Sequence, residues 1–367
     1  MAFHSLILFV GGLVALIVGA EGLVRGASRL AATLGTPPLV IGLTVVAFGT
    51  SSPELVVSVQ AALSGQSAIA LGNVVGSNIF NVLFILGLSA LAAPLVVSEQ
   101  VVRHDVPIMI GVSSLVMLLA TDNVLGRVEG LFLVGLLVLY LLFLAWIERM
   151  RRRPTAEHPV EPRPRLGLRT FLTDGAFIVA GLALLVLGSR WLVASATDLA
   201  RVLGLSELVI GLTIVAAGTS LPEVATSVTA SIRGERDIAV GNVVGSNIFN
   251  LLMVLGTTSA ISPTGVVVPP AALTFDMPVM IAVAIACLPV FFAGFKISRW
   301  EGAVFVAYYV AYVTFLALDA SNHAAAPIFS VIMLSFVVPI TALTFTIVFI
   351  RQRSRSAAAR SPSPPAR

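Results

Sequence analysis

Two glutamates, Glu54 and Glu223, end matching apolar stretches of the sequence. Residues 39–54 read LVIGLTVVAFGTSSPE, and residues 208–223 read LVIGLTIVAAGTSLPE. Neither stretch contains Lys, Arg or a second acid. An ionised carboxylate at membrane depth costs at least about 2.5–3.5 kcal/mol on insertion scales, so it requires a cation, a proton or a buried basic partner. Because neither stretch contains a basic residue, a mobile cation is the favoured partner.

Neutral oxygen donors lie close to both glutamates in the sequence. A Thr–Ser pair in each stretch supplies hydroxyl groups, and a following proline frees carbonyl groups about one turn earlier, near Ala47 and Ala216. The decapeptide GNVVGSNIFN occurs at 72–81 and again, unchanged, at 241–250. Its Ser and its last Asn are spaced i,i+4 and share one helical face. The candidate ligands are Glu54, Glu223, Thr50, Thr219, Ser51, Ser220, Ala47, Ala216, Ser77, Ser246, Asn81 and Asn250.

This donor set consists of oxygen atoms alone, without His or Cys. Hard oxygen ligands in a flexible shell of about six to eight suit Ca²⁺, and smaller subsets suit Na⁺. Two carboxylates brought together would repel each other unless cations lay between them. One divalent ion or several monovalent ions would remove that repulsion. The ions would be transported substrates, and no resident cofactor is expected.

Other interpretations of these motifs stay open. A glutamate beside a proline can mark a helix end at the membrane surface, although its duplication within uncharged sequence argues against this. The glycine-rich decapeptide can serve helix packing alone. Asp105 and Asp276, each two residues before a proline, are predicted to cap helices rather than to bind ions. Cys287 is interpreted as a small packing residue, and the four histidines form no metal-binding or proton-relay motif.

The whole chain is unusually apolar. Of its 367 residues, 57% are hydrophobic and 11% are charged, and its mean hydropathy is +1.02. In a typical soluble domain, about 45–50% of the residues are apolar and about 25% are charged. This excludes a soluble enzyme, a disordered chain and a disulfide-rich secreted module, and it predicts an all-α polytopic membrane protein. The net charge of +4 comes mainly from an Arg-rich loop and an Arg-rich tail. No nucleic-acid partner is predicted, and contact of the Arg-rich loop with anionic lipid is a weaker interpretation.

The sequence predicts an internally repeated fold. Eleven apolar runs are candidate spans, and the four near Val45, Val75, Val215 and Val244 are interrupted by Gly, Pro, Ser, Thr or Asn. Such breaks are tolerated in a bilayer only where the backbone lines a cavity or packs against protein. Both motif pairs are 169 residues apart, which gives five spans in each half. A unit with an odd number of spans re-enters the membrane from the opposite side when repeated, as in many secondary transporters.

The expected organisation follows from these repeats and from charge. It comprises a first five-helix repeat at 1–148, an Arg/Pro-rich linker at 149–169, a second, inverted five-helix repeat at 170–318, one additional transmembrane helix at 319–350 and a disordered basic tail at 351–367. The first apolar run has no basic residue ahead of it and is interpreted as a retained helix rather than a signal peptide. The arginines of the linker and the tail predict that both are cytoplasmic, with the N-terminus outside a plasma (inner) membrane.

The two motif pairs resemble the two α-repeats of the cation/Ca²⁺ antiporter superfamily. GTSSPE and GTSLPE, each followed by GNVVGSNIFN, are most similar to its sodium/calcium exchanger branch, including prokaryotic members. The resemblance covers about residues 5–318 and implies a ten-helix core whose second, third, seventh and eighth helices enclose four cation sites. The residues that it assigns to Ca²⁺ are the carboxylates of Glu54 and Glu223, with Thr50, Thr219 and the carbonyls of Ala47 and Ala216. The residues that it assigns to Na⁺ are Ser51, Ser77, Ser220 and Ser246, and it places Asn81 and Asn250 toward the centre.

We therefore expect a secondary-active antiporter, not an enzyme, that exchanges Ca²⁺ for Na⁺ by alternating access with the paired glutamates at mid-membrane. Similar proteins are thought to slide their first and sixth helices, here about 5–34 and 171–203, across a rigid core. The alternatives are a Ca²⁺/H⁺ exchanger, because Glu can carry protons, and a passive cation channel lined by Glu and Ser. The sequence contains no nucleophile–base set of an intramembrane enzyme.

Overall fold

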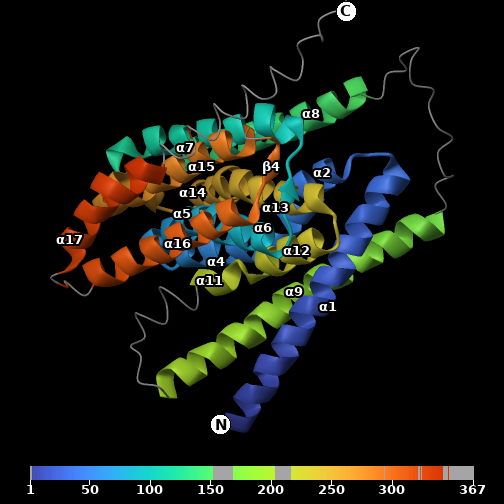
Figure 1. Ribbon diagram of the computed structural model, residues 1–367, viewed down its shortest axis with the longest axis horizontal. Helices are drawn as coiled ribbons and strands as arrows, with labels where there is room; N and C mark the ends of the chain where they lie inside the picture. Colours follow the sequence, from blue (N-terminus) through green and yellow to red (C-terminus); the bar gives the residue numbers. More distant parts are fainter. Residues whose placement is uncertain are drawn as a thin grey trace, which may run out of the picture.

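The chain folds into long helices, seen in a computed structural model that describes residues 2–151, 168–202, 216–292, 294–320 and 325–341, with His323 and Thr346 (Figure 1). Eight of the described helices are long and apolar enough to cross a membrane. A ninth candidate is a pair, Pro38–Thr50 and Ser52–Leu63, bent by 42°. The shorter apolar helix Ala325–Thr341 lies near the C-terminal end of the described chain. The predicted polytopic helical fold is therefore confirmed.

The helices up to residue 151 are α1 (Ala2–Leu34), α2 (Pro38–Ile41), α3 (Ala47–Thr50), α4 (Ser52–Leu63), α5 (Ser67–Phe80), α6 (Gly87–Ala92), α7 (Val106–Leu119) and α8 (Arg127–Arg151). Those from residue 168 onward are α9 (Leu168–Val202), α11 (Ala216–Thr219), α12 (Leu221–Ile232), α13 (Arg236–Phe249), α14 (Gly256–Ile261), α15 (Met277–Phe292), α16 (Arg299–Ala320) and α17 (Ala325–Ile332). Wider π-helical turns lie at Gly42–Val46, Asn81–Leu86, Val101–Asp105, Asn250–Leu255, Ala272–Asp276 and Met333–Val337, and a 3₁₀ turn lies at Ala120–Asp122.

The helices that carry the decapeptide form the centre of the molecule. The most apolar window of the span Arg236–Ile261 is 100% buried, and that of Ser67–Ala92 is 78% buried, whereas that of Arg299–Asp319 is only 17% buried. A span that faces lipid on most sides exposes its apolar side chains, so these fractions separate the inner helices from the outer ones. The polar decapeptide therefore lies where protein, not lipid, surrounds it.

Two short antiparallel ribbons join the halves of the chain. Strand β1 (Leu95–Val96) pairs with β4 (Lys296–Ile297), and β2 (Val124–Leu125) pairs with β3 (Val266–Val267). Each strand has only two residues, too few to give a period-two pattern in the sequence. These ribbons are the part of the described fold that a helix-only prediction lacks.

The prediction that Asp105 and Asp276 cap helices is wrong. Both residues end π-helical turns that continue directly into the α-helices that follow. Asp105 has helical dihedral angles, φ −73° and ψ −41°, and makes no capping hydrogen bond from its side chain. Instead, the hydroxyl of Tyr140 donates to Asp105 at 3.3 Å, and that of Tyr312 donates to Asp276 at 2.8 Å. A π turn adds one residue to a helix without breaking it, so the Asp–Val–Pro pattern did not mark a helix start.

Helices α1 and α9 lie side by side along much of their length and form a unit beside the other helices (Figure 1). Their backbones touch at glycines: a Cβ atom on Gly12 would lie 2.8 Å from the carbonyl oxygen of Gly188, and one on Gly19 would lie 2.8 Å from that of Gly181. The bounds Ala2–Leu34 and Leu168–Val202 agree with the expected first and sixth helices. Because backbone contact leaves no room for side chains, the two helices pack as one body.

Parts of the predicted organisation lie outside the described residues. These are residues 152–167 of the linker, 208–215 of the second motif stretch, most of the chain after residue 341 and the whole tail at 351–367. The domain boundaries, the count of ten core spans and the cytoplasmic placement of the linker and the tail stay predictions.

The glycine contacts between α1 and α9 predict a sharp positional difference in stability. Gly181→Ala places a Cβ atom 2.6 Å from the backbone nitrogen of Leu23, whereas Gly175→Ala, on the same helix, meets no atom within 4 Å. We expect Gly181→Ala to lower stability by about 1–3 kcal/mol through overpacking, and Gly175→Ala to leave it unchanged or raise it by up to about 1 kcal/mol. Thermal unfolding of both purified variants measures this, and equal melting temperatures would contradict the close packing.

Candidate functional site

Each candidate glutamate lies just after a break in a helix. The break before α4 is at Ser51, with φ −81° and ψ 2°, and the break before α12 is at Ser220, with φ −91° and ψ 8°. A proline in the first turn of each helix supports the break, since it has no N–H to donate to the preceding turn. Glu54 and Glu223 occupy the first turns of α4 and α12. The positive end of a helix dipole favours a carboxylate there.

The two carboxylates are completely buried and are linked by crossed hydrogen bonds. Glu54 is 0% exposed and Glu223 is 1% exposed. Ser220, from the break before α12, donates to Oε1 of Glu54 at 2.9 Å, and Ser51, from the break before α4, donates to Oε1 of Glu223 at 3.4 Å. Each carboxylate thus accepts a hydroxyl proton from the opposite half, which brings both motifs into one centre.

No fixed positive charge balances this centre within the described chain. The ion pairs found there join Arg25 to Glu21, Arg233 to Glu21, and Arg103 to Glu99, and none includes Glu54 or Glu223. The hydrogen-bond donors to the two carboxylates are neutral hydroxyl groups. Two buried carboxylates with neutral partners alone are costly, because the desolvation of each charge is uncompensated.

Five buried oxygen atoms around the centre have no hydrogen-bond partner in the described part of the structure. They are Oε2 of Glu54, Oε2 of Glu223, Oδ1 of Asn81, Oδ1 of Asn250 and Oγ of Ser246. Buried polar atoms are almost always paired, so a group of unpaired oxygens requires a partner of another kind. Oxygen atoms of this kind are the ligands of hard cations such as Ca²⁺. The centre can therefore accept positive ions.

The remaining predicted ligands are arranged less uniformly. Oγ of Ser77 lies 3.1 Å from Oγ of Ser220, next to Glu54. The hydroxyl of Thr50 donates to Oδ1 of Asn242 at 3.0 Å, and the half-buried Thr219 donates to Oδ1 of Asn73 at 3.3 Å. Each threonine hydroxyl thus donates to an asparagine of the decapeptide in the opposite half of the chain.

The carbonyl of Ala47 is engaged rather than freed. It accepts the N–H of Ser51 at 3.0 Å and lies 3.4 Å from the hydroxyl of Thr50. The carbonyl four residues before Pro53 is that of Gly49, and it also accepts a backbone N–H at the end of α3. The expectation of a freed carbonyl at Ala47 is therefore wrong, and its role as a ligand stays a prediction. Ala216 opens the matching helix α11.

Two asparagines that sequence analysis missed hold the motifs together. Nδ2 of Asn73 donates to the backbone carbonyl of Glu54 at 3.3 Å and to Ser58 at 3.0 Å, and Nδ2 of Asn242 donates to Ser227 at 2.9 Å. The signal was present in the sequence, because the polar residues 73, 77 and 81 are spaced i, i+4, i+8 on one helical face. The sequence analysis used only residues 77 and 81 of that series.

The last two asparagines of the decapeptide meet their counterparts at the middle of the molecule. Nδ2 of Asn78 donates to the backbone carbonyl of Asn247 at 3.3 Å, and Nδ2 of Asn247 donates to that of Asn78 at 3.4 Å. Nδ2 of Asn81 donates to Asn247, and Nδ2 of Asn250 donates to Asn78. This reciprocal exchange is what a pseudo-twofold axis between two similar halves requires.

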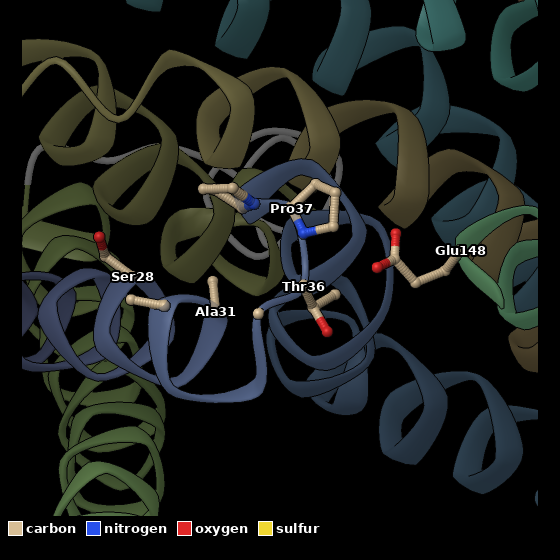
Figure 2. A pocket seen from close by; sticks show the side chains of 8 residues that line it. Ser28, Ala31, Thr36, Pro37 and Glu148 are labelled. Carbon is tan, nitrogen blue, oxygen red and sulfur yellow. The ribbon is translucent and has the colours of Figure 1, made fainter. Parts of the chain in front are cut away.

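A separate, open pocket of about 530 Å³ lies where α1 ends and α2 begins, facing the end of α8. Figure 2 shows Ser28 and Glu148 on opposite sides of it, with Thr36 and Pro37 between them. None of its lining residues belongs to the candidate ligand set. The buried centre and this open pocket are thus different places in the fold.

Comparison with known proteins agrees with the fold and the motifs. The chain matches the family model described as sodium/calcium exchanger protein over residues 4–146 and 175–318. It is 42% identical over 284 residues to inner membrane protein YrbG of Escherichia coli (strain K12), covering 76% of this chain and 86% of that protein. It is 33% identical over 338 residues to sodium/calcium exchanger MaX1 of Methanosarcina acetivorans, covering 83% and 96%. A solved structure of the sodium-calcium exchanger NCX_Mj matches with a TM-score of 0.73 and 28% identity, covering 86% of this chain and 99% of that one.

The hydrogen bonds that Asn73 makes to Glu54, Ser58 and Thr219 predict a structural role for this residue. In Asn73→Ala the backbone carbonyl of Glu54 and the hydroxyl groups of Ser58 and Thr219 lose a partner. We expect a loss of stability of about 1–3 kcal/mol, the usual cost of leaving buried polar groups unpaired. Thermal unfolding measures it, with Gln60→Ala, at an exposed position of helix α4, as the control. A melting temperature for Asn73→Ala equal to that of the control would contradict the structural role of these hydrogen bonds.

Proposed function

Because the chain belongs to the sodium/calcium exchanger protein family, we propose that it is a secondary antiporter that exports Ca²⁺ in exchange for inward Na⁺. The observation that carries this proposal is the crossed pair of buried glutamates without a basic partner in the described chain. Membership of the family supports exchange of Ca²⁺ against another cation. The choice of Na⁺ as the coupling ion rests on the donor set, in which hydroxyl and amide oxygens outnumber carboxylates.

The physical basis of exchange is competition for the same two carboxylates. Ca²⁺ or Na⁺ ions neutralise the pair, but both kinds of ion cannot occupy the full set of ligands together. The empty centre carries two uncompensated charges, and moving it across the barrier is costly. Transport in one direction is therefore tied to return with the other ion.

The candidate ligands divide by their position in the centre. Glu54 and Glu223 are proposed to bind Ca²⁺ directly, because each has one unpaired carboxylate oxygen. Ser77, Ser246 and the serines at the two breaks are proposed to complete Na⁺ positions between the broken helices and the helices α5 and α13. The remaining members of the proposed set are Thr50, Thr219, Ala47, Ala216, Asn81 and Asn250.

Alternating access is proposed to use the α1–α9 pair as the moving part. This pair contacts both broken helices: a Cβ atom on Gly49 would lie 2.6 Å from Leu182 of α9, and Ser189 of α9 donates to the carbonyl of Gly218. Through α9 the pair thus contacts Gly49 of the first motif stretch and Gly218 of the second. A displacement of one rigid unit along the core would expose one break while it covers the other.

The cell location follows from the same proposal. A Ca²⁺ exporter acts in the plasma (inner) membrane, and one relative is named an inner membrane protein. We propose that residues 1–148 and 170–318 form the two inverted repeats, with the N-terminus outside and the segment 149–169 and the tail in the cytoplasm, as the arginine distribution favours.

Ion gradients imposed one at a time test the coupling ion. In proteoliposomes that contain the full-length protein, we expect ⁴⁵Ca²⁺ uptake to be driven by an outward Na⁺ gradient and not by an outward K⁺ gradient or a pH gradient. Uptake driven by the pH gradient alone would make the protein a Ca²⁺/H⁺ exchanger instead. Ca²⁺ flux without any counter-ion would make it a passive channel.

Single substitutions test the two carboxylates. Glu54→Gln and Glu223→Gln keep the side-chain volume and remove one negative charge from the centre. We expect each to lower Na⁺-driven Ca²⁺ uptake by at least about tenfold, because a charged ligand at a buried site contributes more than about 1.4 kcal/mol. Glu301→Gln is the matched control: Glu301 is also buried, at 3% exposed, but accepts hydrogen bonds from Ser298 and no candidate ligand. Full uptake by either centre variant would remove that residue from the site.

A further inference from the structure

Helix α16 packs one of its faces against the π-helical turn that begins at Asn81. The ring centroid of Tyr309 in α16 lies 5.1 Å from that of Phe80 and 5.4 Å from that of Phe84. These separations are typical of aromatic rings that attract each other. Phe80 is the last residue of α5, and Phe84 lies inside the π turn Asn81–Leu86. Tyr309 therefore contacts the chain on both sides of Asn81.

The same face of α16 also meets the helix that follows the π turn. Gly302 precedes Tyr309 by seven residues, which places both on one side of the helix. A Cβ atom on Gly302 would lie 2.6 Å from the carbonyl oxygen of Gly87, the first residue of α6. Nη2 of Arg299 donates to the carbonyl of Ala92, at the end of α6, at 3.4 Å. Helix α16 thus contacts this span before, within and after the π turn.

The other half of the chain contains a matching contact. Residues 127–130 read RVEG, and residues 299–302 read RWEG. A Cβ atom on Gly130 of α8 would lie 2.6 Å from the carbonyl oxygen of Gly256. Gly256 begins α14 directly after the π turn Asn250–Leu255. In both halves, the helix after a π turn is therefore held by a glycine from the opposite half.

The π turn determines which face of α5 points toward the two-glutamate centre. It inserts one residue, and one residue corresponds to a rotation of about 100° about the helix axis. The span can therefore present Gly87 to α16 and Ser77 to the centre, where Oγ of Ser77 lies 3.1 Å from Oγ of Ser220. Asn73, one turn before Ser77, donates to the backbone carbonyl of Glu54. If the contacts on the π turn were lost, α5 could rotate and displace both groups.

We propose that Tyr309 and Gly302 of α16 are positioning residues for Ca²⁺ binding. They hold the π turn Asn81–Leu86 in place and thereby fix the orientation of α5, which carries Ser77 into the centre. Neither residue belongs to the proposed ligand set. The inference rests on the proposed Ca²⁺ site, and it adds to that site an outer helix whose most apolar window is only 17% buried.

The test is the dependence of the melting temperature on Ca²⁺, measured on the purified full-length protein in Na⁺-free detergent solution. A ligand that binds the folded state raises the melting temperature with a concentration dependence set by its Kd. We expect Tyr309→Ala to raise the apparent Kd for Ca²⁺ at least about threefold, the usual range for substitutions that act through packed neighbours. Tyr309→Phe should stay within about twofold of the unmodified protein, because its ring makes the same aromatic contacts.

Tyr308→Ala is the matched control. Tyr308 is the preceding residue of α16 and is also half-buried. Its hydroxyl lies 2.7 Å from Oγ1 of Thr341 and 3.1 Å from the carbonyl oxygen of Val337, away from the π turn. We expect Tyr308→Ala to lower the melting temperature without Ca²⁺ and to leave the apparent Kd within about twofold, because it acts on separate partners. A purely structural role of Tyr309 would give Tyr309→Ala the same behaviour.

The outcomes separate this inference from the proposed function. An apparent Kd of Tyr309→Ala equal to that of Tyr308→Ala would overturn the positioning role and leave the Ca²⁺ site standing. A rise in Tyr309→Phe as large as in Tyr309→Ala would also overturn it, since the ring contacts would not be the cause. A melting temperature of the unmodified protein that does not respond to Ca²⁺ would overturn the proposed function and the inference together.

Further variants extend the test. Gly302→Ala pushes α16 away from α6 and should raise the apparent Kd in the same direction. If Tyr309→Ala does not fold, Tyr309→Leu replaces it, because leucine keeps apolar volume but lacks the ring. The expected rise and the overturning result are then the same as for Tyr309→Ala.

Discussion

The rest of the structure depends on two buried carboxylates that lack a fixed counter-charge. Glu54 and Glu223 are 0% and 1% exposed, and the described chain places only neutral hydroxyl donors on them. The helix breaks at Ser51 and Ser220 make this arrangement tolerable, because each sets a helix N-terminus and its partial positive charge beside a carboxylate. Neutral donors and helix dipoles lower the cost of the charge without cancelling it. The proposed binding of cations rests on the negative charge that these donors and dipoles do not cancel.

Neither half of the chain can build this centre alone. Ser220 donates to Glu54 and Ser51 donates to Glu223. Asn78 of α5 and Asn247 of α13 each donate to the other's backbone carbonyl. The two ribbons tie the same halves together at a distance from the centre. A displacement of one half relative to the other would break matched contacts in both motifs at once. The core is therefore expected to stay rigid, which is consistent with the proposal that the moving part is α1 and α9, whose backbones pack on each other at glycines.

The sequence predicted the features that each repeat contains by itself. Polytopic helices and broken spans were inferred from single stretches, and the duplicated motifs and the family from the direct comparison of two stretches; the family and the helical fold are confirmed. The misses concern contacts between stretches. Asp105 accepts a hydrogen bond from Tyr140, 35 residues away, so its local pattern suggested a cap that does not exist. Asn73 accepts from Thr219 of the other half, and no pattern in one stretch contains that partner.

The symmetry of the centre does not extend to the ends of the α1–α9 pair. On one side, Glu21 of α1 pairs with Arg233, and Ser28 donates to Glu235 at 2.7 Å, so the pair is tied to the turn between α12 and α13. In the turn between α4 and α5, the residues that match Arg233 and Glu235 are Ser64 and Gln66, and neither carries a charge. If the α1–α9 pair moves as proposed, these charged contacts at a single turn are expected to stabilise one of its positions relative to the core.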